Sequence, residues 1–187
     1  MIGFFLRQVR GPLVLVLLIA AIGYGYFLTR LLPFWAEMQA AAGGAELQET
    51  LFYSAERAGA ALGSYDAHLR RGALSFYALD IVFAGLFASA LAGLMAYGLR
   101  RLHAEATPWR FALILPLASG GFDLLENAML AIALATNPAT PGFIGTIAGV
   151  ATGLKLTLGM ISLPLTLLLL IAAGGRHAWR QLNPKSD

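Results

Sequence analysis

Apolar residues gather along the chain in four long runs, and charged or turn-forming residues separate these runs. A membrane-spanning helix needs about 20 apolar residues, because each residue advances roughly 1.5 Å across a hydrocarbon core about 30 Å thick. All four runs are long enough. The pattern therefore predicts an all-α membrane protein with four transmembrane helices, at about residues 11–30, 73–99, 111–135 and 143–173.

Two of these runs allow more than one interpretation. The first follows Arg7 and Arg10 like a signal peptide, but from Gly11 to Thr29 it exceeds the usual apolar stretch of about 7–15 residues. We therefore expect a retained helix. The fourth is densest from residue 154 to 173, whereas residues 143–153 are rich in Gly, Ala and Thr. This earlier stretch either extends the helix outside the membrane or enters the membrane part-way.

The loop at residues 31–72 is the one sizeable segment outside these runs. Within it, Glu46 to Leu62 shows partial helical periodicity between the turn signals Gly43-Gly44 and Gly63-Ser64. We expect a short amphipathic helix that caps the bundle or lies on the membrane surface, with a plain linker helix as the alternative. The other loops are short, at residues 100–110 and 136–142, which predicts an antiparallel bundle. The second of them holds two prolines, Pro138 and Pro141.

Composition agrees with a single membrane domain over residues 1–187. Hydrophobic residues make up 58% of the chain and charged residues 12%, against about 25% charged residues in soluble domains. The net charge of +3 lacks the basic stripe typical of nucleic-acid binding, so we expect no nucleic acid as a partner. There is no cysteine, the three histidines lack ligand spacing, and no nucleotide or nucleophile motif occurs. We predict neither a metal nor a cofactor.

The distribution of basic residues predicts the orientation. Cytoplasmic loops carry an excess of Lys and Arg, and tryptophans mark the membrane interfaces. One side of the predicted bundle holds eight basic residues and the other four: Arg7, Arg10, Arg100, Arg101, Arg110, Arg176, Arg180 and Lys185 against Arg30, Arg57, Arg70 and Arg71. Trp109 and Trp179 fall on the first side and Trp35 on the second. We expect a protein of the bacterial inner membrane with both termini in the cytoplasm.

Several polar residues lie inside the predicted helices, where an ionisable group costs about 2.5–3.5 kcal/mol on insertion scales. They are Asp80, Asp123, Glu126, Asn127 and Lys155. Counted along each helix, all five fall in the outer half of the membrane. On the third helix, residues 123, 126 and 127 share one face. On the other helices, Tyr77 shares a face with Asp80, and Thr152 with Lys155. We predict one polar cluster of these seven residues.

The cluster allows a structural and a functional interpretation. In the first, Lys155 pairs with Asp123 or Glu126, and the pairs orient the bundle. In the second, three carboxylates against one lysine leave a local charge of −2. Then a carboxyl keeps its proton, a cation enters, or an arginine of the outer loop folds over the site. Such groups suit cation binding, proton transfer or acid–base catalysis.

These possibilities give three functional hypotheses. The first is a binding or accessory protein, with membrane lipids around it, that holds a lipophilic or cationic ligand or docks to a larger membrane complex. The second is a membrane enzyme acting on a lipid, isoprenoid or quinone-like substrate. In it Glu126 or Asp123 is the general acid or base, and Lys155 holds an anionic group. The third is a proton or cation pathway, which requires oligomers because four helices leave little pore.

An aspartate early in the second helix, in Tyr77-Ala78-Leu79-Asp80, is followed in the third helix by Asp123-Leu124-Leu125-Glu126-Asn127. This pairing resembles a group of small, uncharacterised bacterial four-helix membrane proteins, over about residues 65–138. In that group a Phe-Pro and then a Tyr follow the first aspartate, whereas Ile81-Val82-Phe83-Ala84 has no proline. The resemblance implies the four-helix architecture. It implies no activity, because none is established for that group.

Overall fold

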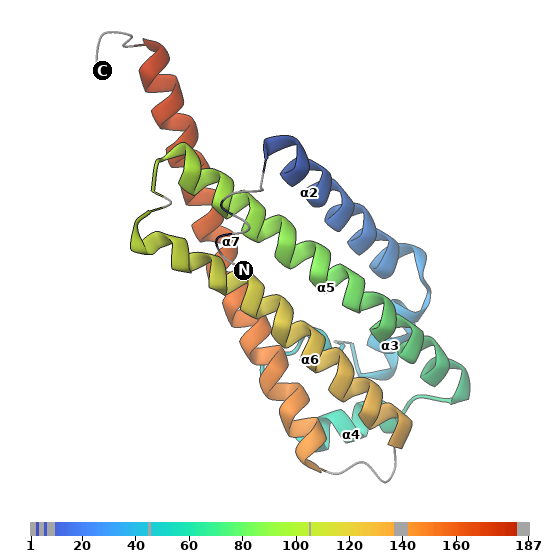
Figure 1. The fold of residues 1–187 in the computed structure, drawn as a ribbon. Coiled ribbons are helices and arrows are strands. Elements are labelled where there is room, and N and C mark those ends of the chain that lie inside the picture. The colour runs from blue at the N-terminus through green and yellow to red at the C-terminus, as the bar shows by residue number, and fades with distance from the viewer. Residues whose placement is uncertain are drawn as a thin grey trace.

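The structure of the chain is a computed structural model that describes residues 3, 6, 10–44, 46–104, 106–136 and 142–182. The described residues form helices and connecting turns, without a strand (Figure 1). Four predictions made above fall on residues outside these ranges, namely those on Arg7, Pro138, Pro141 and Lys185.

Four helices are long and apolar enough to span a membrane. The first consists of α2 (Gly11–Tyr26) and a π-helical turn η1 (Phe27–Leu31). The second is α5 (Ala67–Arg101), the third combines a 3-10 turn η3 (Pro108–Leu113) with α6 (Ile114–Thr136), and the fourth is α7 (Gly142–Leu182). The four apolar runs in the sequence therefore correspond to the four long helices.

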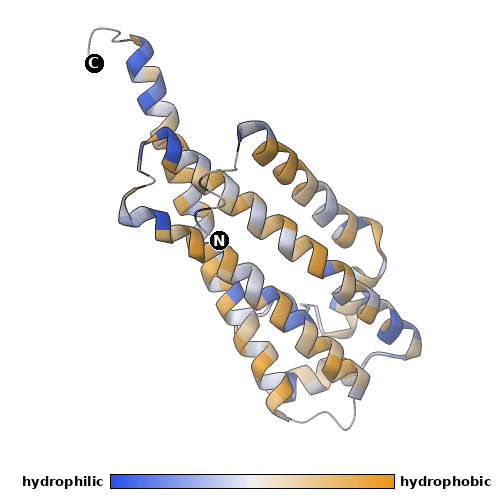
Figure 2. Ribbon diagram, in the orientation of Figure 1, coloured by the Kyte–Doolittle hydropathy of each residue, from blue (hydrophilic) through white to orange (hydrophobic). Residues whose placement is uncertain are grey.

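Two of these helices are longer than the apolar pattern predicts. The N-cap of α5 is Asp66, whose carboxylate accepts a hydrogen bond from the Leu69 amide at 2.8 Å, and the helix continues through Arg70 and Arg71. The last turns of α7 pass Arg176 and Arg180. Arginine is a good helix former, so a charged residue ends an apolar run without ending its helix. At 1.5 Å per residue, α5 is roughly 50 Å long and α7 roughly 60 Å. Figure 2 shows hydrophilic residues gathered at the C-terminal end of α7.

The loop between the first two long helices folds into three short elements: α3 (Phe34–Ala41), η2 (Leu47–Glu49) and α4 (Ala55–Gly63). The helix expected within Glu46–Leu62 is thus confined to its second half. A 3-10 turn and Phe52, whose φ of 51° lies in the left-handed region, interrupt the helical path before it. The sequence pattern also missed α3, which places Trp35 against Phe76 with ring centroids 5.1 Å apart.

The beginning of α7 presents a face of three glycines, Gly145, Gly149 and Gly153, to the outer loop. Loop residues 52–55 lie so close that side chains there would clash. A Cβ at Gly145 would approach Ala55 Cα to 2.9 Å, and one at Gly149 would overlap the Tyr53 carbonyl. The stretch 143–153, which the sequence left open, is therefore a continuous part of α7 that seats the loop.

The helices pack around two apolar cores. α5 lies in the middle of the molecule and contacts α2, α6 and α7, while α6 and α7 pack side by side (Figure 1). One core joins the outer loop to α5, α6 and the start of α7, with Tyr77 and Leu130 among its buried residues. The other lies where α2 begins and α5 ends, around Val14 and Met95. α4 packs against α7 and α6, so the loop covers one end of the helices.

Candidate functional site

A buried lysine joins α7 to α6. Lys155 Nζ lies 3.1 Å from Asp123 Oδ1 and 2.5 Å from Glu126 Oε2. Asp123 and Glu126 are one turn apart on α6, so a single ammonium reaches both carboxylates. The side chains of Lys155 and Asp123 are 13% exposed, and that of Glu126 is completely buried. The second oxygen of Glu126 lies 2.5 Å from the Thr152 hydroxyl, which donates to it. The lysine thus offsets the charge of one carboxylate, and the three ionised groups together keep a net charge of −1.

Next to this ion pair, a chain of amides holds Asp80. Asn127 Nδ2 donates to Asp80 Oδ2 at 2.9 Å, and Gln48 Nε2 donates to Asn127 Oδ1 at 2.5 Å. The same Gln48 nitrogen lies 3.5 Å from Asp80 Oδ2. All three residues are buried. Within the described part of the chain Asp80 has no ion-pair partner, so its polar contacts there come from neutral amides.

The outer loop adds a carboxyl of its own to this region. Glu46 is completely buried, and its Oε2 accepts a hydrogen bond from the Gln48 backbone amide at 2.5 Å. The pKa of Glu46 is raised from the usual 4.5 to about 7, mainly by burial; the hydrogen bond from the Gln48 amide lowers it, the nearby charge of Glu126 raises it, and that of Lys155 lowers it. Burial also raises the pKa of Tyr53 and Tyr65, beside Glu126 and Glu46 respectively. At neutral pH a large share of Glu46 therefore carries a proton.

This raised pKa predicts that the loop docks more tightly in acid. The docked loop retains a proton on Glu46 that an undocked, solvated glutamate with a pKa of 4.5 releases. Docking of the loop should therefore become less favourable as the pH rises from about 4.5 to 7, and should change little above that range. The total change is roughly 3 kcal/mol, or a few hundredfold in the opening equilibrium. Hydrogen exchange of residues 46–54, corrected for the intrinsic rate at each pH, measures it.

Glu46→Gln is the control for this pH dependence. The amide fills the same space and does not titrate, so the protection of residues 46–54 should lose most of its pH dependence. The groups that face Glu46 from the surrounding elements, Glu126, Lys155, Tyr65 and Tyr77, stay in place in this variant. An unchanged slope in Glu46→Gln would assign the titration to another group.

A cleft of about 150 Å³ opens beside the cluster. Charged and amide groups on its wall are Gln48, Glu49, Asp80, Asp123 and Lys155. Its aromatic wall consists of Trp35, Phe76 and Phe83, and the remaining lining residues, Gly25, Leu28 and Thr29, come from the end of the first long helix. Leu28 and Thr29 belong to the π-helical turn η1, a distortion that occurs frequently at functional sites.

Six of the seven residues in the predicted cluster take part in hydrogen bonds or ion pairs, in two adjacent groups: Asp80 with Asn127, and Asp123, Glu126 and Thr152 with Lys155. Tyr77 is buried in the adjoining apolar core instead, with its ring edge-on to Phe76. Sequence reasoning missed Glu46, Gln48 and the aromatic wall of the cleft. Of the arginines on the outer side, Arg30, Arg57 and Arg71 are exposed. The loop instead contributes a further carboxyl, Glu46, and an amide, Gln48.

Four helices of this length and apolarity suggest an integral membrane protein, and the buried carboxylates beside the cleft are its chemically distinctive feature. When the chain is compared with known proteins, it matches no family model, no curated protein and no solved structure. Function is therefore argued from the site itself.

Proposed function

We propose that this protein lies in the cytoplasmic membrane as an antiparallel four-helix bundle, with both termini in the cytoplasm. The support is the asymmetry of the basic residues, eight on the side of the termini against four in the outer loop. In this orientation the cleft lies in the outer half of the membrane, and the outer loop covers it. The cleft then opens where the hydrocarbon core meets the headgroups.

We further propose that the cleft binds the cationic head of a lipophilic amine. The observation that carries this proposal is Asp80, a buried carboxyl on the cleft wall that is held by two neutral amides and has no ion-pair partner within the described residues. Lys155 is not an ion-pair partner of Asp80, because Asp123 and Glu126 already share its charge. A buried carboxylate without a counter-charge is costly, and a cationic ligand removes that cost.

The aromatic wall supports the same ligand class. Trp35, Phe76 and Phe83 line the cleft together with Asp80, and Trp35 stacks on Phe76. The face of an aromatic ring attracts an ammonium group, by about 0.5–1 kcal/mol where exposed and about 2 kcal/mol or more where desolvated. A carboxylate and several rings around one small space are thus a suitable environment for an organic cation.

The size of the cleft limits what enters it. Pockets for drug-sized ligands measure about 300–1,000 Å³, and this cleft measures about 150 Å³. The space suits an ammonium head better than a whole amphiphile. Leu28, Phe83 and Gly25 form an apolar part of the wall, on the side of the first long helix. An aliphatic tail would leave along this side towards the lipid.

Three ligands with the same tail and different heads test the proposal: octylamine, octanol and octanoate. Octylamine should stabilise the purified protein against thermal unfolding, and octanol and octanoate should have much weaker effects. Asp80→Asn should weaken octylamine binding by about ten- to a hundredfold, because a hydrogen bond to a charged group contributes about 1.5–3 kcal/mol. Thermal shift against ligand concentration measures both effects.

Asp66→Asn is the matched control for Asp80→Asn. It makes the same chemical change on the same helix, at an exposed N-cap position where asparagine is also a favoured residue. Octylamine should bind this variant as it binds the unchanged protein. Equal stabilisation by octanol and octylamine, or equal losses in the two variants, would contradict a cation site at Asp80.

A further inference from the structure

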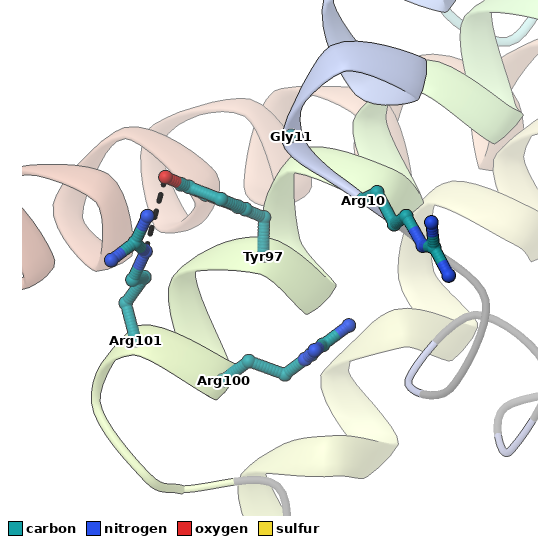
Figure 3. Close-up of a pocket in the computed structure, with 5 residues that line it drawn as sticks. All are labelled: Arg10, Gly11, Tyr97, Arg100 and Arg101. Carbon is teal, nitrogen blue, oxygen red and sulfur yellow. Dashed lines mark hydrogen bonds between the residues drawn. The ribbon is translucent and has the colours of Figure 1, made fainter.

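The opposite end of the bundle contains a second hollow, lined by basic residues. It measures about 390 Å³, and Arg10, Gly11, Tyr97, Arg100 and Arg101 surround it, where α2 begins and α5 ends (Figure 3). Arg101 Nε donates to the Tyr97 hydroxyl at 3.1 Å. In Figure 3, Arg10 and Arg100 extend to one side of Tyr97 and Arg101 lies on the other. Arginine side chains thus lie on both sides of Tyr97 at the hollow.

This basic hollow continues towards α7. A neighbouring hollow of about 320 Å³ shares Tyr97 and Arg101 and adds Leu170 and His177, and a smaller one adds Arg176 and Arg180. None of the described residues that line these hollows is acidic. The carboxylates of the described residues lie in the outer loop, at the outer start of α5, or in the polar cluster. Basic side chains from α2, α5 and α7 thus gather at this end of the bundle.

We propose that this basic hollow binds the phosphodiester headgroup of an anionic phospholipid. Arginine binds phosphate with two parallel hydrogen bonds, and basic pockets between transmembrane helices are typical sites for such headgroups. The volume lies within the range of ligand pockets and suits a glycerophosphate group. Leu170 and Ala173 in the neighbouring hollow provide apolar surface where the acyl chains would begin. If these arginines only fixed the orientation of the chain in the membrane, they would not need to line one common hollow.

Nanodiscs test this proposal on the full chain. We expect the protein to be more heat-stable in phosphatidylcholine nanodiscs that contain phosphatidylglycerol than in phosphatidylcholine alone, and to retain phosphatidylglycerol in native mass spectrometry. Arg10→Gln combined with Arg100→Gln should weaken this retention by about tenfold or more, because charge-assisted hydrogen bonds are lost. Arg57→Gln combined with Arg71→Gln removes the same charge from exposed positions on the outer side and should leave retention unchanged.

A variant that changes no charge distinguishes lipid binding in the hollow from a general attraction of the lipid to the basic residues around it. A Cβ at Gly11 would lie 3.4 Å from the Tyr97 ring, so Gly11→Leu fills the hollow while every arginine remains. It should reduce phosphatidylglycerol retention without reducing heat stability in phosphatidylcholine. Equal losses in the two double-arginine variants, or full retention in Gly11→Leu, would overturn the proposal. Inorganic phosphate or glycerol phosphate that displaces the lipid at low millimolar concentration would assign the hollow to a soluble anion and also overturn it.

Discussion

Replacing Lys155 by methionine is expected to destabilise the protein by roughly 3–5 kcal/mol, the usual cost of removing one partner from a buried ion pair. Methionine has a similar length and no charge, so Asp123 and Glu126 then face each other across one turn of α6 without the ammonium that lies 3.1 and 2.5 Å from them. The two acids must repel each other or take up protons. Unfolding in a titration with sodium dodecyl sulfate, followed by tryptophan fluorescence, measures the loss.

Neutralising the whole group provides the control. Lys155→Met combined with Asp123→Asn and Glu126→Gln leaves no charge among the three side chains, so most of the lost stability should return. Glu126→Gln alone should cost less than Lys155→Met, because Lys155 keeps Asp123 as a partner. A triple variant as unstable as Lys155→Met would show that packing of the lysine stem, and not its charge, stabilises the bundle.

Helix geometry and the cost of burying charge were enough to predict that the polar residues of the cluster meet. The contact of Lys155 with Asp123 and Glu126 follows from helix geometry, because a spacing of three residues places both acids on one face of α6. Hydrocarbon tolerates these groups only when they meet, so their depth and face were enough to predict that they converge. The same reasoning placed Asn127 and Asp80 in one cluster, but it did not predict the hydrogen bond between them. Helical spacing and ionisable residues inside membrane-spanning segments are therefore informative even without an alignment.

The contribution of the outer loop could not be predicted in this way. Glu46 and Gln48 lie in a segment with ordinary loop composition, where an acidic and an amide residue are expected to face water. Their burial depends on the irregular path of residues 46–54, which includes the left-handed Phe52, and no periodicity encodes such a path. The aromatic wall of the cleft depends on α3, a short helix whose position is fixed by tertiary contacts such as that between Trp35 and Phe76.

One signal for the docked loop was present in the sequence, although its meaning required a structure. Gly145, Gly149 and Gly153 recur every four residues at the start of α7. Such spacing is typical of close packing in membranes, and it is usually associated with a second helix. Here the partner is the irregular loop stretch at residues 52–55. Because this stretch follows Glu46 and Gln48 within a few residues, a change in the glycine face should also shift these two side chains.

Gly149→Leu is therefore expected to remove the outer loop from the polar cluster while leaving the four long helices folded. The new side chain would overlap the Tyr53 carbonyl, which is backbone and cannot rotate away, whereas leucine favours the helical conformation of α7 itself. Hydrogen exchange should show residues 46–54 losing their protection and residues 154–173 keeping theirs. Gly121→Leu is the matched control, since nothing lies within 4 Å of a Cβ at this exposed position on α6. Equal protection of the loop in both variants would mean that the glycine face does not seat it.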